Sequence, residues 1–300
     1  MNLFANLAKP EYMCHPAQIW RRVARVFGGA PRPHETVRLP WGMPLTIRPG
    51  EDIGRQIWAM GVFDLCVTEA LWRLVDPGEL TIDVGGNIGY MSSILSVRAG
   101  RRGRVIAFEP HPDVFKDFAA NAAGWQQARG WTNVEARQLA LGNHSGEARL
   151  AVPDRFEENR GLARIQSDTT GNHAPTIPIA MTTLTKELAA GDRIGVLKID
   201  VEGHELPVLE GAEALLRERR VREIIFEERG DFPSPVAQFL QRRGFEIFAL
   251  RPRLSGPRLE PPDRPVSPLR QWETPSFLAT MDSKRARDRF APRGWQSLRG

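Results

Sequence analysis

One set of residues that could bind a ligand or take part in catalysis surrounds a glycine-rich turn at positions 85–89. A short apolar run at residues 81–84 leads into the turn, and a second apolar run at 105–108 ends in Glu109. Strand, glycine turn, helix, second strand and terminal acid together form a unit that binds a ribose-bearing cofactor at the carboxyl edge of a parallel sheet. The glycines would let the backbone approach the ligand, and the acid could accept hydrogen bonds from both ribose hydroxyls.

The identity of the cofactor follows from what this turn contains and lacks. A glycine turn alone is often only a tight connection between a strand and a helix. Here Asp83 is an ionisable residue in a strand that should be buried, and together with Glu109 it favours a nucleoside site. The turn has no Gly-x-Gly-x-x-Gly pattern for a dinucleotide and no Walker lysine for a triphosphate. Asp83 would repel a pyrophosphate but suits a ligand with an amino group and a sulfonium, which indicates S-adenosylmethionine.

The second set of residues is the run Lys-Ile-Asp-Val-Glu-Gly-His at positions 198–204. A central parallel strand should be apolar, yet Lys198, Asp200 and Glu202 alternate with a period of two and would share one face while the strand stays extended. Asp200 could act as a general base or orient an acceptor hydroxyl. His204 is the alternative base, since an unperturbed imidazole titrates near pH 6.5, at about neutrality. A structural alternative is an ion pair of Lys198 with Asp200, plus helix capping by Glu202 or His204.

The expected site residues come from the loops that follow successive strands. Asp83 should meet the amino group of the cofactor, directly or through water, and Glu109 should bind the ribose. The adenine should lie beside residues 138–141, where the third strand ends. The predicted cofactor contacts are Asp83, Gly85, Gly86, Asn87, Gly89, Glu109, Pro110, Gln138, Leu139 and Ala140. The predicted catalytic residues are Asp200, Glu202 and His204.

A metal ion is an alternative reading of the acidic residues. Asp200, Glu202 and Glu227 carry the hard oxygen ligands that magnesium prefers. Glu202, together with Glu227 or Glu228, could equally hold substrate hydroxyls. Carboxylates beside a cationic cofactor need no metal to explain them, so we predict no metal site.

Four motifs of the chain resemble those of the FkbM-type family of S-adenosylmethionine-dependent methyltransferases. They occupy residues 83–90, 105–110, 140–142 and 197–205 and follow the order of the family. Two positions depart from its pattern: Gly86, where alanine is usual, and Thr185, where an aspartate usually follows the leucine. The resemblance covers roughly residues 50–281, and it implies a class I Rossmann-like fold and methyl transfer from S-adenosylmethionine.

The order of the expected elements predicts an α/β fold, a three-layer sandwich around a mostly parallel seven-stranded Rossmann-like sheet. Expected strands lie near 80–84, 105–109, 134–139, 196–201, 224–228, 245–250 and 276–281, and expected helices near 113–129, 186–190, 205–219 and 234–243. This alternation requires right-handed crossovers between parallel strands. No helix separates the last two strands, so the final strand should form an antiparallel edge, as in the methyltransferase sheet that the chain resembles.

We divide the chain into an N-terminal helix and hairpin extension at 1–50, a methyltransferase domain at 51–281 and a basic C-terminal tail at 282–300. An apolar stripe over residues 53–75 predicts one helical region packed on the sheet. Within it, Phe63 and Asp64 sit where the family has an aromatic-acid pair near the pocket, although a capping or core role fits them equally. Residues 154–174 form either a lid over the substrate or a solvated mobile loop.

Composition limits the classes of partner. The 41% hydrophobic content can bury a substantial core. A net charge of +5 comes from arginines spread along the chain without aromatic interleaving, so we predict no nucleic-acid partner. No apolar run approaches the roughly 20 residues that span a bilayer, and the N-terminus lacks the apolar core of a signal peptide. Cys14 and Cys66 form no metal or disulfide pattern, so the cytoplasm is the expected compartment.

These features predict an O-methyltransferase that acts on a hydroxyl of a small molecule, a sugar, or a glycan or polyketide-type precursor. Methyl transfer needs an aligned attacking oxygen, exclusion of water and a proton acceptor. Two other functions stay open: an NAD-dependent Rossmann-type oxidoreductase, and a catalytically silent scaffold that binds the cofactor. The acceptor and the oligomeric state are not determined by the sequence.

Overall fold

A computed structural model of the chain describes residues 32–153, 156, 158–166, 175–228, 232–263 and 275–299. The first 31 residues, where the helix of the N-terminal extension is expected, lie outside these ranges, as does much of the 154–174 loop. Within the described ranges, no helix has both the length and the apolar composition needed to cross a membrane.

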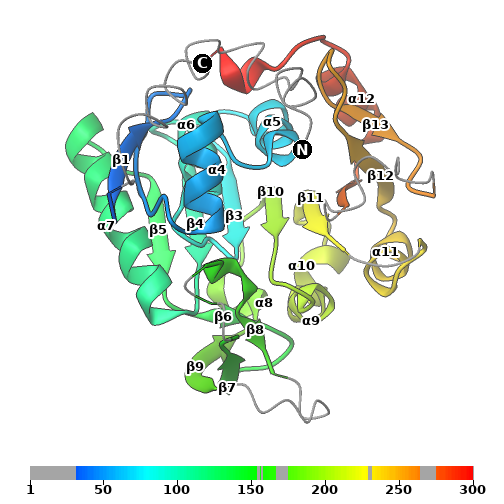
Figure 1. Cartoon of the computed structure of the whole chain (residues 1–300). Coiled ribbons are helices and arrows are strands. Elements are labelled where there is room, and N and C mark those ends of the chain that lie inside the picture. The colour runs from blue at the N-terminus through cyan, green and yellow to red at the C-terminus, as the bar shows by residue number, and fades with distance from the viewer. Residues whose placement is uncertain are drawn as a thin grey trace.

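An eight-stranded sheet forms the middle of the structure (Figure 1). Its strands, in spatial order, are β13 (Arg258–Glu260), β12 (Glu246–Arg251), β14 (Ser276–Thr280), β11 (Val221–Glu227), β10 (Ile194–Ile199), β3 (Leu80–Val84), β4 (Arg104–Phe108) and β5 (Val134–Arg137). The five strands from β11 to β5 pair in parallel, whereas β14 is antiparallel to both of its neighbours. The predicted fold class, a layered α/β sandwich with a mostly parallel Rossmann-like sheet, is confirmed.

The far side of this sheet differs from the prediction in two details. The strand Ser276–Thr280 is antiparallel as expected, but it lies between β11 and β12 instead of at the edge. All five of its residues are buried, as suits a strand with neighbours on both sides. The edge is formed by an eighth strand, Arg258–Glu260, which pairs with β12 and is not among the seven expected strands. Neither strand order nor a three-residue pairing is visible in hydrophobic periodicity.

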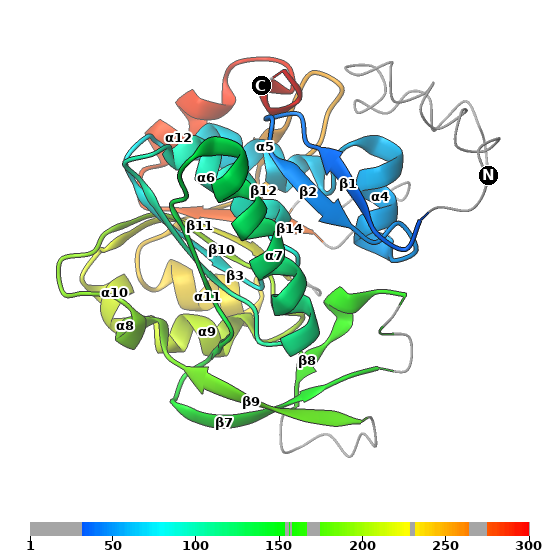
Figure 2. The ribbon, with the colours of Figure 1, turned by 90° about the vertical axis from the view of Figure 1, so that its left-hand side faces the viewer.

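Helices cover both faces of the sheet (Figures 1 and 2). One face carries α4 (Asp52–Met60), α5 (Leu65–Leu74), α6 (Tyr90–Ala99), α7 (Pro112–Arg129) and α12 (Ser283–Phe290), together with the hairpin of β1 (Glu35–Arg38) and β2 (Pro44–Ile47). The other face carries α8 (Leu184–Glu187), α9 (Glu205–Gly211), α10 (Glu213–Arg217) and α11 (Pro235–Gln241). Side chains alternate between the two cores, so that Val105 packs in the first and Ile106 in the second.

The apolar stripe at 53–75 forms two helices instead of one continuous helix. Gly61, with a φ of 81°, ends α4 in the left-handed conformation that glycine adopts without strain. Asp64 caps the N-terminus of α5 and accepts a hydrogen bond from the Val67 backbone N–H at 3.0 Å. The break between the helices matters for function, because residues 62–64 turn toward the carboxyl ends of the central strands.

A second, four-stranded sheet projects beyond those carboxyl ends (Figure 1). It consists of β6 (Ala140–Leu141), β9 (Thr176–Thr182), β7 (Gly146–Ala151) and β8 (Arg164–Ile165), in that order. The expected third strand, 134–139, therefore ends early at Arg137, and the chain leaves the main sheet before Ala140. The 3₁₀ turn η1 (Arg160–Leu162) leads into β8.

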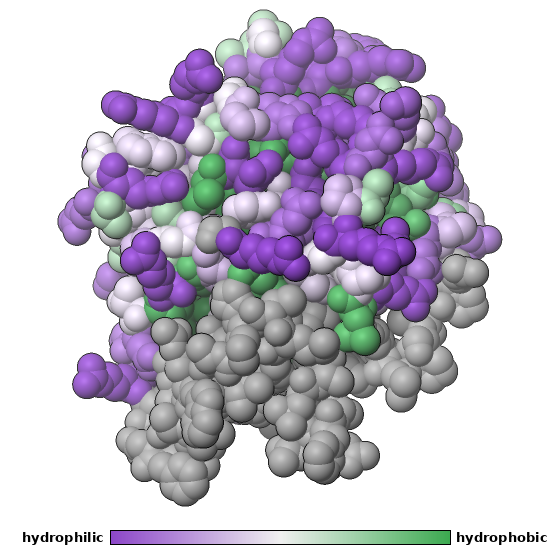
Figure 3. Space-filling model, turned by 90° about the horizontal axis from the view of Figure 1, so that it is seen from above, coloured by the Kyte–Doolittle hydropathy of each residue, from purple (hydrophilic) through white to green (hydrophobic). Residues whose placement is uncertain are grey.

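The C-terminal segment is packed into the domain, although we had treated 282–300 as a separate basic tail. The buried carboxylate of Glu69 accepts hydrogen bonds from the backbone of Gln296 and Ser297, at the start of the 3₁₀ turn η3 (Gln296–Leu298). Trp295 is 1% exposed and belongs to the core. In the view from above, the part of the surface formed by described residues is mostly hydrophilic, with small separate apolar patches (Figure 3).

Candidate active site

A cavity of about 1400 Å³ lies at the carboxyl ends of the central strands. The turn after β3, the residues after β4 and β10, and the end of β11 form its floor. Helix α4 and residues 62–67 close one side, and residues 159–165 close another. Because pockets for one drug-sized ligand measure roughly 300–1,000 Å³, the cavity has room for two ligands side by side.

Lys198 joins the two predicted sets of residues. It lies opposite Asp83 in the register of β10 and β3, and its Nζ atom is 3.3 Å from Oδ1 of Asp83 and 3.5 Å from Oδ2 of Asp200. The same ammonium donates a hydrogen bond to the carbonyl oxygen of Gly85 at 3.0 Å. Burial alone would lower the pKa of Lys198, but the two carboxylates raise it above its ordinary value. The ammonium therefore stays charged and fixes the strand end against the glycine turn.

Asp83 lies beneath the turn and does not line the cavity. Its side chain is completely buried and accepts a hydrogen bond from the hydroxyl of Ser92 on α6 at 2.6 Å. The structure thus places Asp83 away from the space expected for the cofactor amino group. Asp83 therefore contacts that space only indirectly, through its ion pair with Lys198 and through the turn that lies above it.

The glycines of the turn are required by neighbouring protein atoms. Gly85 has a φ of +79°, and a Cβ atom there would overlap the carbonyl oxygen of Asp200. A Cβ atom on Gly86 or Gly89 would come within 2.7 Å of the Phe118 ring. The sequence predicts that these glycines let a ligand approach the backbone. In the fold they also make room for Asp200, in the loop that follows β10, and for Phe118 of α7. Gly85 and Gly86 line the cavity, and Gly89 does not.

Glu109 lies at the end of β4, beside the turn and beside Pro110, and all of them line the cavity. The Asn87 backbone N–H donates to Oε2 of Glu109, and the His111 backbone N–H donates to Oε1, both at 2.9 Å. Burial raises the pKa of Glu109 to about 7, against the opposing effect of these two hydrogen bonds. The carboxylate is thus held in one orientation, with a pKa near neutrality.

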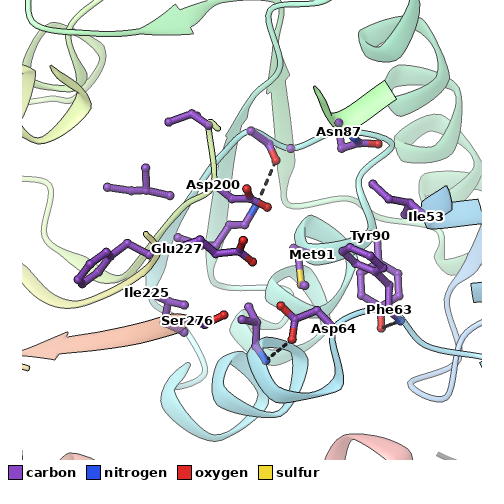
Figure 4. A pocket seen from close by; sticks show the side chains of 18 of the residues that line it. Ile53, Phe63, Asp64, Asn87, Tyr90, Met91, Asp200, Ile225, Glu227 and Ser276 are labelled. Atoms are coloured by element: carbon purple, nitrogen blue, oxygen red, sulfur yellow. Dashed lines mark hydrogen bonds and ion pairs between the residues drawn. The ribbon is translucent and has the colours of Figure 1, made fainter. Parts of the chain in front are cut away.

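Two carboxylates from neighbouring strands point into the same space (Figure 4). Asp200 follows β10, and Glu227 is the last residue of β11; Asp64 and Ser276 lie at one end of this space. Burial raises the pKa of Glu227 to about 9, and the neighbouring Asp200 carboxylate acts in the same direction. Glu227 is therefore neutral at pH 7.

Glu202 lines the cavity, but it does not continue the alternation that we expected. Its φ of 53° is left-handed, so the chain turns away from the strand direction directly after Val201. Its carboxylate lies 3.4 Å from the guanidinium of Arg164 on β8. Glu205 holds this turn by accepting hydrogen bonds from the backbone of Val201 and Gly203.

His204 lies outside the cavity. Its Nε2 atom is buried without a hydrogen-bond partner among the described residues and sits against Gly142. Burial lowers the pKa of His204, and the nearby His144 lowers it further. The turn at Glu202 has rotated this side chain to the far side of the loop, so His204 is not placed to act as a base.

The structure places Gln138 outside the cavity, where the sequence predicts a cofactor contact. It is exposed and lines no part of the cavity, because β5 ends one residue earlier and the chain then crosses to the small sheet. Its neighbours Leu139 and Ala140 do line the cavity.

Several lining residues escaped the sequence argument. Residues 250–254, Pro275 and Trp295 form the far end of the cavity. The Tyr90 hydroxyl accepts a hydrogen bond from the Phe63 backbone and faces the same space. These segments are far apart in the chain, and no local spacing in the sequence predicts that they lie close together. In the described part of the chain, no three His, Cys, Asp or Glu side chains are grouped so as to hold a metal ion.

Comparisons with known proteins find similarity to methyltransferases. The Methyltransferase FkbM domain matches residues 83–247, more than half of the chain. Methyltransferase 1 of Beauveria bassiana is 26% identical over 201 residues, covering 60% of this chain and 77% of its own length. The hexuronic acid methyltransferase AglP of Haloferax volcanii is 31% identical over 172 residues, covering 55% of this chain and 62% of its own length. A solved structure of methyltransferase FkbM from Methylobacillus flagellatus aligns with a TM-score of 0.43 at 16% identity, over 77% of this chain and 60% of that one.

Proposed function

The chain belongs to the FkbM family of S-adenosylmethionine-dependent methyltransferases, and from this premise we propose that it methylates a hydroxyl group of a sugar or of a similarly hydroxylated small molecule. The reaction class follows from the family. The acceptor class is supported by the Haloferax relative, which is a hexuronic acid methyltransferase, and by the carboxylates at the acceptor end of the cavity.

The cofactor half of the cavity has the groups that S-adenosylmethionine needs. The carboxylate of Glu109 accepts hydrogen bonds from the ribose hydroxyls, because each of its oxygens has a second lone pair beyond the one used by the backbone. Leu139, Ala140 and Leu141 provide an apolar surface for the adenine. The turn at residues 85–87 forms the wall toward the methionine portion. When bound, the cofactor supplies a methyl group activated by its sulfonium.

Asp200 is the proposed general base. It lies between the glycine turn and the acceptor half of the cavity, and the ammonium of Lys198 fixes it from behind. It takes the proton of the acceptor hydroxyl as that oxygen bonds to the methyl carbon. Glu202 lines the cavity and forms an ion pair with Arg164 on β8, and it is proposed to position the acceptor. The enclosing residues of α4 and of 159–161 exclude water from the reacting atoms.

The single observation that carries this proposal is the continuity of one cavity from Glu109 to Asp200. The test is incubation of the purified chain with S-adenosylmethionine and a panel of hexuronic acids and methyl glycosides, followed by mass spectrometry. We expect S-adenosylhomocysteine and a methylated glycoside in equal amounts, and a loss of turnover in Asp200→Asn with cofactor binding retained. Binding of NADH without binding of S-adenosylhomocysteine would instead support an oxidoreductase.

Metal independence and a cytoplasmic location are also proposals. Turnover that survives EDTA would support direct deprotonation by Asp200. Restoration of lost turnover by magnesium would instead place a cation among Asp200, Glu202 and Glu227.

A further inference from the structure

The environments of Asp200 and Glu227 differ although both side chains face the same space. Asp200 has the ammonium of Lys198 at 3.5 Å. The carboxyl group of Glu227 forms no ion pair and no hydrogen bond with any described residue, whereas its backbone pairs with that of Ser276 on β14. Lys198 acts on this carboxyl group only over a longer distance. Because the ammonium pairs with Asp200 and not with Glu227, the two neighbouring carboxyl groups form a pair in which Asp200 carries the charge and Glu227 holds a proton.

The other charged groups around Glu227 favour the same state. Asp200 follows β10, Asp64 caps the N-terminus of α5 and Glu202 lies in the turn after Asp200; all three carboxylates oppose ionisation of Glu227. Among the described residues that act on Glu227 most strongly, Lys198 is the cation that favours its ionisation, and burial of the side chain is the largest effect against it. These effects raise the pKa of Glu227 to about 9, so its ionised form is dominant only above that pH.

We propose that Glu227 works as a neutral acid that donates a hydrogen bond to an acceptor oxygen next to the hydroxyl whose proton Asp200 takes. The acceptor must therefore carry two neighbouring oxygen atoms, as the vicinal diols of sugars do. Asp200 accepts from one oxygen and Glu227 donates to the other, which fixes the attacking oxygen by two contacts of opposite polarity. This inference rests on the proposed methylation of a hydroxyl and narrows the acceptor class.

The proton balance is simple under this assignment. The reacting hydroxyl loses its proton to Asp200, its oxygen bonds to the methyl carbon, and the bond from that carbon to sulfur breaks. Glu227 keeps its proton throughout and remains a donor. A neutral Glu227 also leaves Asp200 as the anionic member of the pair, free to receive the proton.

The first test needs no acceptor and measures unfolding against pH. The folded pKa of Glu227 lies above the ordinary glutamate value, so the contribution of this side chain to wild-type stability should fall as pH rises from about 5 to about 9 and then level off. Glu227→Gln cannot ionise. The unfolding equilibrium constant of Glu227→Gln, divided by that of wild type, should therefore decrease by up to about tenfold for each unit that the pH rises across that window. Glu147→Gln, at an exposed position on β7, is the control and should follow wild type.

Identical pH profiles for Glu227→Gln and wild type would overturn the proposal, whatever the acceptor is. The outcome does not depend on methyl transfer, so it separates a failure of this inference from a failure of the proposed function.

The second test uses methyl glucopyranoside, methyl glucuronide and their monodeoxy analogues as probes. We expect kcat/KM of Glu227→Ala to fall at least about a hundredfold on the diol, because a site built to hydrogen-bond an oxygen loses that contact. Glu227→Gln, which keeps a neutral N–H donor, should recover to within about tenfold of wild type. On the acceptor that lacks the neighbouring oxygen, wild type and Glu227→Ala should be equal. A Glu227→Ala loss of the same size on both acceptors would overturn the proposed contact.

Discussion

The ammonium of Lys198 lies 3.3 Å from the fully buried carboxylate of Asp83. The two residues are direct neighbours in the register of β10 and β3, the strands that lead to Asp200 and to the glycine turn at residues 85–89. Lys198 also reaches the carbonyl of Gly85 and the carboxylate of Asp200. One buried ion pair thereby sets the distance between the two halves of the site.

Removal of this ammonium should be costly. In Lys198→Met the side chain keeps its length, but the Asp83 carboxylate stays buried without a cation, which destabilises a fold by roughly 3–5 kcal/mol. Chemical denaturation measures the change. The double variant Lys198→Met/Asp83→Asn should recover part of the loss, because no uncompensated charge remains. Equal stability of the single and double variants would show that the pair is not coupled.

A methyl group at Gly85 should damage the site more than one at Gly78. Both glycines have positive φ values, +79° and +89°, so alanine at either position costs about 1–2 kcal/mol from the backbone alone. At Gly78 a Cβ atom meets open space, whereas at Gly85 it overlaps the carbonyl oxygen of Asp200. Gly85→Ala should therefore lower both thermal stability and affinity for S-adenosylhomocysteine, and Gly78→Ala only stability. Equal affinities in the two variants would contradict the packing argument.

Cofactor binding should strengthen as pH rises through neutrality. The pKa of Glu109 is raised to about 7 in the fold, so at pH 6 most molecules carry a protonated Glu109, which is a poorer acceptor for ribose hydroxyls. The dissociation constant of S-adenosylhomocysteine should increase by up to about tenfold per pH unit below the pKa and level off above pH 8, as titration calorimetry can measure. Glu109→Gln should bind more weakly and show a flat profile. A wild-type constant independent of pH would exclude this role.

The segment at residues 158–165 should control ligand release. Arg160 is buried, forms an ion pair with Asp117 on α7 and lies 3.9 Å from Glu51. At the other end of the segment Arg164 pairs with Glu202. Arg160→Ala should speed dissociation of S-adenosylhomocysteine at least about tenfold in stopped-flow displacement, because binding mutations act mainly on the off-rate. Arg149→Ala, at an exposed position on β7, is the matched control and should leave the off-rate unchanged.

The sequence predicted those cavity-lining residues whose position depends on one strand end at a time. Glu109 and the turn at 85–87 come directly after apolar strands, and in a parallel sheet those ends meet at one edge. Asp200 is located by the same rule. The rule gives position but not rotation: the left-handed residue Glu202 turns the chain and carries His204 out of the cavity.

Long-range pairings were beyond the sequence argument. The partner of Lys198 on the neighbouring strand is Asp83, and only the register of the two strands reveals it. The early end of β5, which leaves Gln138 exposed, depends on pairing within the small sheet. Gly61 breaks an apolar stripe whose period is correct on both sides, so its effect on Asp64 is invisible to periodicity. Trp295 reaches the cavity because buried Glu69 and Arg73 hold the C-terminal segment.

Calorimetric titration of S-adenosylhomocysteine into wild type, Glu109→Ala and Asp200→Asn tests the central claim most directly. That claim is the division of one cavity into a cofactor half at Glu109 and an acceptor half at Asp200. The division predicts one-to-one binding to wild type, at least about tenfold weaker binding to Glu109→Ala, and an affinity for Asp200→Asn close to that of wild type. No binding to wild type, or equal binding to wild type and Glu109→Ala, would contradict the claim.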